Sequence, residues 1–155
     1  MFALIFGLSF LANAQDVQKD QPKGYQFTDI KRLPATSVKD QARAGTCWSW
    51  SGISFFESEM IRMGKEPIDL SAMYIVRHAY SDKATKFVRL HGSMNFAVGG
   101  AFCDVMHVIK NYGIVPMDVY MGLNYGEPNH AFGEIDDVLA GYINAVIKNS
   151  NKKLS

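Results

Sequence analysis

The chain has 155 residues, of which 48% are hydrophobic and 20% are charged, and its formal net charge is +1. This length is enough for one domain with a hydrophobic core of its own. The nearly balanced charge gives no support for a nucleic-acid or membrane-surface partner.

The first eleven residues are almost wholly apolar, and Ala12-Asn13-Ala14 follows them as an Ala-x-Ala cleavage pattern. The apolar run is well short of the ~20 residues that a membrane-spanning helix needs. We therefore predict that 1–14 is a secretory signal peptide, although it lacks the usual Lys or Arg. This prediction places the mature protein in the periplasm or outside the cell; if it fails, the cytoplasm is expected. Residues 15–32 are polar and predict an extended N-terminal segment.

The pattern from Cys47 to about Met63 predicts the first helix. Its end is indicated by Gly64 as a C-cap, with Pro67 soon after it. Apolar residues occupy most sides of this helix, which is typical of a central, buried element. They are Trp48, Trp50, Ile53, Phe55, Phe56, Met60 and Met63.

A second helix is predicted after Ser71, whose side chain suits an N-cap. The helical pattern continues through Tyr80. Residues 81–94 are polar and mixed, and we expect mainly loop there.

A third helix is predicted for 101–112, where Gly113 supplies the C-cap and Pro116 blocks continuation. A fourth is predicted for 134–149. Only short extended pieces accompany these helices, so the sequence indicates a mainly α-helical structure.

Cys47 stands at the predicted start of the first helix, six residues after Gln41, with Gly45 between them. This arrangement suits a thiol nucleophile, because the Gln41 side-chain amide and the Cys47 backbone N–H could hold an oxyanion. Gly45 allows a tight turn with positive φ. An ordinary cysteine is only ~3% thiolate at pH 7, and a helix N-terminus raises that to about 15% at best. We therefore expect a histidine to be required as the base.

Cys103 allows other interpretations of the two cysteines. An exported chain can close a disulfide, here Cys47–Cys103, which would leave no nucleophile. Cys103 and His107 also stand four residues apart on one helix face, as metal ligands can, but no third ligand lies nearby in the sequence. We expect core packing for both side chains and no metal site.

The remaining polar candidates have ordinary interpretations. His78, His91 and His130 are expected at the surface or at helix ends, with His130 in a loop. Gly99 and Gly100 fit either a cleft wall, where substrate backbone could pair, or a simple turn. Four carboxylates are expected to be solvated or to cap helices: Glu57, Glu59, Asp136 and Asp137.

The residues around the thiol resemble the nucleophile region of the papain-like cysteine peptidases. Those that carry the resemblance are Gln41, Gly45, Cys47, Trp48 and Ser51, and it extends from about Asp29 to Asn149. Two segments look most like the bleomycin hydrolase or aminopeptidase C branch: Phe55-Phe56-Glu57-Ser58-Glu59 and Tyr112-Gly113-Ile114-Val115-Pro116. Ala44 stands where secreted members usually carry a disulfide-forming Cys, and this departure also fits that branch.

The resemblance implies an α+β, papain-like fold, of which this chain holds mainly the α-helical, nucleophile-bearing half with little strand. Residues 33–155 would then be the truncated N-terminal part of that domain. It also implies a cysteine-type (amino)peptidase that acts on peptide substrates without a cofactor, and a homo-oligomer is one expectation for the full-length parent. The implied site residues are Cys47 as nucleophile, Gln41 in the oxyanion hole, and Gly99, Gly100 and Trp48 at the substrate.

In papain-like enzymes the catalytic His and Asn lie ~130–150 residues beyond the nucleophile, at about 177–197 in this numbering. The sequence ends at Ser155, so we expect the isolated chain to be inactive. Two rivals stay open. One is a non-catalytic exported half-domain that binds peptides or pairs with another chain, and the other is a small disulfide-closed secreted protein.

Overall fold

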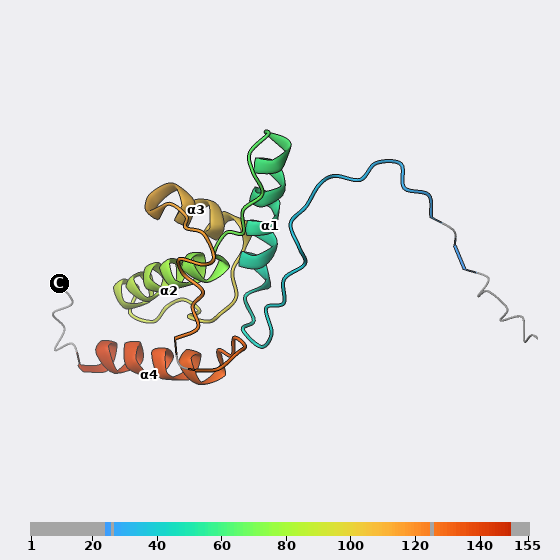
Figure 1. Cartoon of the computed structure of the whole chain (residues 1–155). Coiled ribbons are helices and arrows are strands. Elements are labelled where there is room, and N and C mark those ends of the chain that lie inside the picture. The colour runs from blue at the N-terminus through green and yellow to red at the C-terminus, as the bar shows by residue number, and fades with distance from the viewer. Residues whose placement is uncertain (1–23, 26, 125, 150–155) are drawn as a thin grey trace, which may run out of the picture. The chain divides into compact units, whose positions relative to one another are not determined.

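The computed structural model describes residues 24–25, 27–124 and 126–149 (Figure 1). The chain divides into two units at Arg32, and each is described by itself. The described part of the first unit contains neither helix nor strand. The predicted signal peptide, 1–14, lies outside the described residues. No helix among the described residues is long and apolar enough to span a membrane.

The second unit is built from four helices (Figure 1): α1 (Cys47–Arg62), α2 (Ala72–Arg89), α3 (Phe102–Tyr112) and α4 (Gly133–Asn149). All four were predicted from the sequence pattern. Across the described residues the only β-pairings are two isolated bridges, Arg43 with Ala131 and Leu70 with Pro116. The prediction of a mainly helical structure with little strand is therefore confirmed.

The expected helix ends are found in two places. The Ser71 hydroxyl accepts a hydrogen bond of 3.0 Å from the Tyr74 N–H and so caps α2. This contact satisfies one of the amides that the first turn of a helix leaves unpaired. Gly113 ends α3 with a φ of 82°, a conformation that favours glycine.

The prediction of a loop over 81–94 is wrong for its first part, because α2 continues to Arg89. Phe87 explains the extension. It lies two turns beyond Tyr80, is buried, and packs against Phe96 with ring centroids 5.9 Å apart. The polar residues between these aromatics cover the solvent side of the helix.

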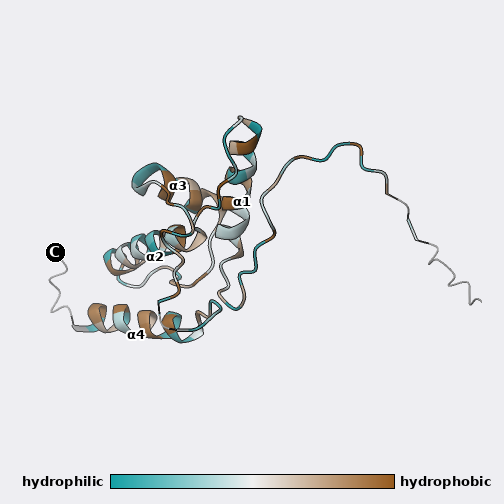
Figure 2. Cartoon of the chain, in the orientation of Figure 1, coloured by the Kyte–Doolittle hydropathy of each residue, from teal (hydrophilic) through white to brown (hydrophobic). Residues whose placement is uncertain are grey.

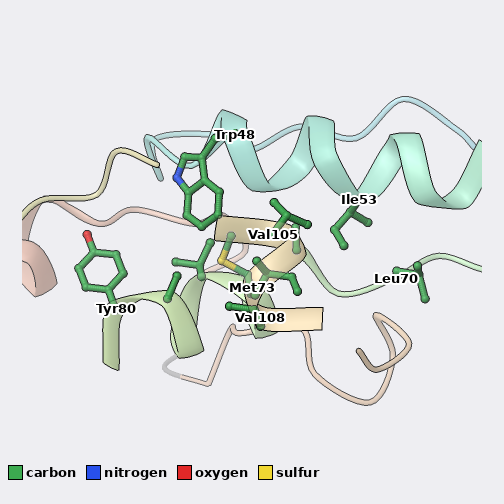
Figure 3. Packing of buried hydrophobic residues seen from close by; sticks show 11 residues of the cluster. Trp48, Ile53, Leu70, Met73, Tyr80, Val105 and Val108 are labelled. Carbon is green, nitrogen blue, oxygen red and sulfur yellow. The ribbon is translucent and has the colours of Figure 1, made fainter. Parts of the chain in front are cut away.

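The core lies between α1, α2 and α3 (Figure 3). Its fully buried side chains include Ile53 of α1, Ile75 of α2 and Val105 of α3. Each such side chain stabilises the fold by ~1.5–3 kcal/mol relative to exposure. Gly52 allows α1 to approach α3 closely, because a Cβ at this position would lie 2.8 Å from a methyl group of Val105.

Burial on α1 is less complete than the sequence predicts. Phe55 of α1 is exposed, and so is Met63, which lies just past the helix end. The prediction that they belong to a buried stripe is wrong, because only one face of α1 packs on α2 and α3. Figure 2 shows apolar and polar residues mixed along α4, where Ile143 is buried and Val138 is exposed.

Candidate functional site around Cys47

Cys47 is the first residue of α1, and its side chain is exposed. The chain reaches it through a turn in which the Ala44 N–H donates to the Gln41 carbonyl oxygen at 3.2 Å. Gly45 has a φ of +64°, as the sequence predicted for a tight turn at this position. The local backbone therefore places a solvent-accessible thiol at a helix N-terminus.

Thr46 occupies the N-cap position of α1, but its side chain does not cap the helix. Its hydroxyl oxygen instead accepts a hydrogen bond of 3.1 Å from the indole Nε1–H of Trp50. The first turn of a helix has four N–H groups without intrahelical partners. At the start of α1 these groups, which include the Cys47 N–H, have no side-chain cap.

Cys47 and Gln41 line the same cavity, which has a volume of about 450 Å³. The Gln41 side chain is half-buried, and its Oε1 has no hydrogen-bond partner among the described residues. The other lining residues come from the extended segment before the turn and from the first two turns of α1. They are Ala35, Thr36, Ser37, Val38, Lys39, Trp50, Ser51 and Ser54.

Trp48 does not line this cavity. Its side chain is only 7% exposed and belongs to the core, and its Nε1–H donates to the Val98 carbonyl oxygen at 3.0 Å. A Cβ at Gly100 would lie 2.5 Å from the nearest atom of the indole ring. Gly99 and Gly100 are exposed and also lie outside the cavity wall, with the Gly99 carbonyl accepting a hydrogen bond from Lys83. Trp48 is thus the support on which the Val98–Gly100 segment rests.

The expectation that His130 lies at the surface is wrong, because it is only 5% exposed. The isolated bridge between Arg43 and Ala131 draws this loop against the turn that precedes Cys47, and the Arg43 N–H donates to the His130 carbonyl oxygen at 3.0 Å. The imidazole lies 5.8 Å from the Trp50 ring, and its Nδ1 has no partner among the described residues. Burial lowers the pKa of His130 below its ordinary value.

His78 of α2 and His91, which follows that helix, differ in setting. His78 is half-buried, and its ring stacks on Tyr112 with centroids 4.3 Å apart, so it is not a plain surface residue. Burial lowers its pKa, and the charge of Arg77 lowers it further. His91 is exposed just beyond the end of α2, as expected. None of these imidazoles, nor that of His130, lines the Cys47 cavity.

Both cysteines are free, which contradicts the disulfide alternative. The expectation of core packing for Cys103 and His107 is also wrong, because both are exposed. Val105 and Val108 supply the buried face of α3, and Cys103 and His107 lie off that face. The described residues contain no group of three or more His, Cys, Asp or Glu that could hold a metal ion.

Two of the carboxylates expected in solvent have specific partners. Glu57 is 1% exposed and accepts a hydrogen bond of 2.7 Å from the Leu70 N–H. Asp136 accepts a hydrogen bond of 2.6 Å from the Tyr80 hydroxyl, and this contact together with burial raises the pKa of Tyr80 above its ordinary value. Sequence reasoning missed both contacts because each partner is distant along the chain. Glu59 follows the expectation, forming an exposed ion pair with Arg62.

Comparison with known families gives one match. The profile described as papain family cysteine protease matches residues 22–132, which include the turn, α1, α2 and α3. Among curated proteins, none matches the chain.

Proposed function

The chain belongs to the papain family of cysteine proteases, and we propose that Cys47 is its nucleophile and Gln41 its oxyanion donor. One observation carries this proposal: the exposed thiol at the first residue of α1 shares a cavity with the Gln41 side chain. The family match supports cysteine peptidase chemistry in general. In this proposal Cys47 provides the nucleophile and one oxyanion donor at the helix start, and Gln41 provides the second donor from the preceding turn.

In the proposed reaction the Cys47 thiolate adds to the carbonyl carbon of the scissile bond. The carbonyl oxygen becomes an oxyanion, which accepts hydrogen bonds from the Gln41 amide and the Cys47 N–H. Collapse of this intermediate expels the amine, which takes up a proton, and leaves an acyl group on Cys47. Water then hydrolyses the acyl-enzyme and restores the thiol. The absence of a side-chain cap at the start of α1 supports this role, because no capping side chain competes for the Cys47 N–H.

We propose that the base is supplied by polypeptide outside the described residues. The cavity supports this proposal, because no imidazole lies among its lining residues. A helix N-terminus stabilises an anion by only ~0.3–1 kcal/mol, too little to convert most of an ordinary thiol to thiolate at neutral pH. The chain by itself is therefore expected to show no peptide-bond turnover.

The finer assignment is an aminopeptidase of the bleomycin hydrolase or aminopeptidase C type. It is supported by Ala44 at the position of the usual disulfide Cys and by the Tyr112–Pro116 segment. We also propose export of the protein, on the strength of the apolar run at 1–11 and the Ala12-Asn13-Ala14 pattern.

The test compares two reactions of the same thiol. Iodoacetamide alkylates a thiolate by displacing iodide, and no oxyanion forms. The p-nitrophenyl ester of an amino acid acylates it through carbonyl addition, with release of nitrophenolate. Only the second reaction benefits from an oxyanion donor. Cys103 is the internal control, because it is also exposed and free.

We expect the ester to acylate Cys47 faster than Cys103, with the acyl group located by peptide mass spectrometry. Gln41→Ala should slow acylation of Cys47 at least ~10-fold, because one oxyanion donor contributes about 10²–10³ in rate in complete enzymes. The same variant should leave alkylation of Cys47 by iodoacetamide unchanged. Equal acylation of the two cysteines would contradict the nucleophile assignment and favour the non-catalytic peptide-binding alternative.

A further inference from the structure

A buried carboxylate lies beneath the wall of the Cys47 cavity. Glu57 is on α1, and its side chain is fully buried. Burial of a carboxylate is costly unless hydrogen bonds and an opposite charge compensate it. The partners of Glu57 therefore stabilise its buried carboxylate, and the carboxylate in turn fixes the position of those partners.

The hydrogen bonds of the Glu57 carboxylate all reach segments outside α1. One carboxylate oxygen, Oε2, accepts hydrogen bonds from the Thr36 hydroxyl and from Lys39 Nζ, the latter at 2.7 Å. The other oxygen, Oε1, accepts from the Leu70 N–H at 2.7 Å. The carboxylate thus joins two segments that flank α1.

Lys39 extends the same network. Its Nζ forms a second ion pair of 2.8 Å with Asp69, and its side chain is 14% exposed. Burial alone would lower the pKa of Lys39, but the hydrogen bonds to Asp69 and Glu57 outweigh that effect and raise it. Lys39 therefore stays charged at neutral pH, as the pairing with Glu57 requires.

The segment held in this way is the wall of the cavity. Residues 35–39, called the wall segment here, all line the cavity of Cys47, and none of them is in a helix or strand. Without backbone pairing of its own, this segment depends on side-chain contacts for its position. Gln41 follows it by two residues, and the Asp40 carboxylate closes the intervening turn by accepting from the Ala42 N–H at 2.7 Å.

We propose that Glu57 is a positioning residue of the Cys47 site: its buried carboxylate holds the wall segment through Thr36 and Lys39, and thereby sets where Gln41 presents its amide. The inference rests on the proposed roles of Cys47 and Gln41. Glu57 does not line the cavity and acts only through the wall segment.

Three single variants of the full chain test this role. Glu57→Gln removes the charge at nearly constant volume. Thr36→Val removes one contact to the wall segment and leaves the Glu57–Lys39 pair in place, so it serves if Glu57→Gln fails to fold. Glu59→Gln is the matched control, because Glu59 lies on the same helix but pairs with Arg62 at the surface.

The first measurement is the ratio of ester acylation to iodoacetamide alkylation at Cys47. Glu57→Gln and Thr36→Val are expected to lower it at least ~10-fold, because small displacements of a catalytic group cost large factors in rate. Alkylation alone should change little, and Glu59→Gln should match the unmodified chain. The second measurement is the rate of tryptic cleavage after Lys39 in the native chain, which should rise in the first two variants only, because the side chain of Lys39 is then held less firmly.

The outcomes separate the two proposals. A folded variant at Thr36 or Glu57 that keeps the original ratio, or that keeps the original rate of cleavage after Lys39, overturns the positioning role. If the unmodified chain already shows no preference of the ester for Cys47 over Cys103, the nucleophile assignment fails instead. In that case the rate of cleavage after Lys39 still decides whether Glu57 fixes the wall segment.

Discussion

Gly100 and Gly99 are neighbours with opposite expected responses to a methyl group. A Cβ at Gly100 would lie 2.5, 2.6 and 2.9 Å from three atoms of the Trp48 indole, whereas a Cβ at Gly99 has nothing within 4 Å. Neither glycine has a positive φ that would itself disfavour alanine. The pair therefore isolates the steric effect of the indole from any effect of the backbone.

For Gly100→Ala the contributions can be added from the geometry. The methyl group must displace a ring that is buried, and overpacking of this kind costs about 1–3 kcal/mol. Displacement also weakens the hydrogen bond from Trp48 to Val98, a net loss of about 0.5–1.5 kcal/mol. Reduced entropy of the unfolded chain returns about 0.4–1 kcal/mol. We expect a net loss of about 0.5–4 kcal/mol, whereas Gly99→Ala should be neutral or gain up to about 1 kcal/mol.

The assay is urea unfolding of the unmodified chain and both variants, followed by tryptophan fluorescence and by circular dichroism. Trp48 is one of two tryptophans in the chain, so its displacement should also alter the native emission spectrum of Gly100→Ala. Equal unfolding free energies for the two variants would refute the reasoning, because they would mean that the indole does not rest against Gly100.

Two further predictions concern stability. Gly52→Ala should destabilise the chain by up to about 2 kcal/mol in urea unfolding, because overpacking against Val105 outweighs the helix preference of alanine. Gly141→Ala has open space around the new methyl group and should stabilise the chain by about 0.5–1 kcal/mol. A gain in stability from both variants would be inconsistent with the α1–α3 contact. Stability should also decrease as the pH falls below about 6.5, because burial lowers the folded-state pKa values of His130 and His78, so that the unfolded chain binds more protons in that range. His130→Gln should make this dependence shallower in unfolding curves measured at several pH values, and an unchanged slope would exclude a contribution from His130.

Local signals explain why so much of the helical structure could be predicted. Ser71 caps α2 and Gly113 ends α3 through contacts within a few residues, and such contacts are visible in the sequence. Gly45 likewise has the positive φ that its place before Cys47 required. The turn at Gly45 and the start of α1 could therefore be predicted from local sequence, whereas the contact of Arg43 with His130 that also holds the turn could not.

Contacts between distant segments explain the errors. His130 was expected at the surface because its neighbours are typical of loops, yet a single bridge between Arg43 and Ala131 buries it. Glu57 was expected to be solvated or to cap a helix, because nothing in the local sequence indicates that Thr36 and Lys39 lie beside it.

The same limit applies to α3. Cys103 is apolar enough for a core, but an 11-residue helix buries one narrow face, which Val105 and Val108 fill. The residues of α3 alone do not indicate which face is buried, because that depends on how α1 and α2 pack against the helix.

The orientation of Thr46 has a consequence for any attempt to stabilise this protein. Threonine at a helix start commonly contributes about 0.5–2 kcal/mol by capping, and here its hydroxyl is committed to the Trp50 indole instead. A carboxylate introduced at that position would compete for the amides beside Cys47 and bring negative charge to the place where an oxyanion must form. A stabilising cap at the start of α1 would thus lower the reactivity of Cys47. Substitutions meant to raise thermostability should therefore be placed away from the start of this helix.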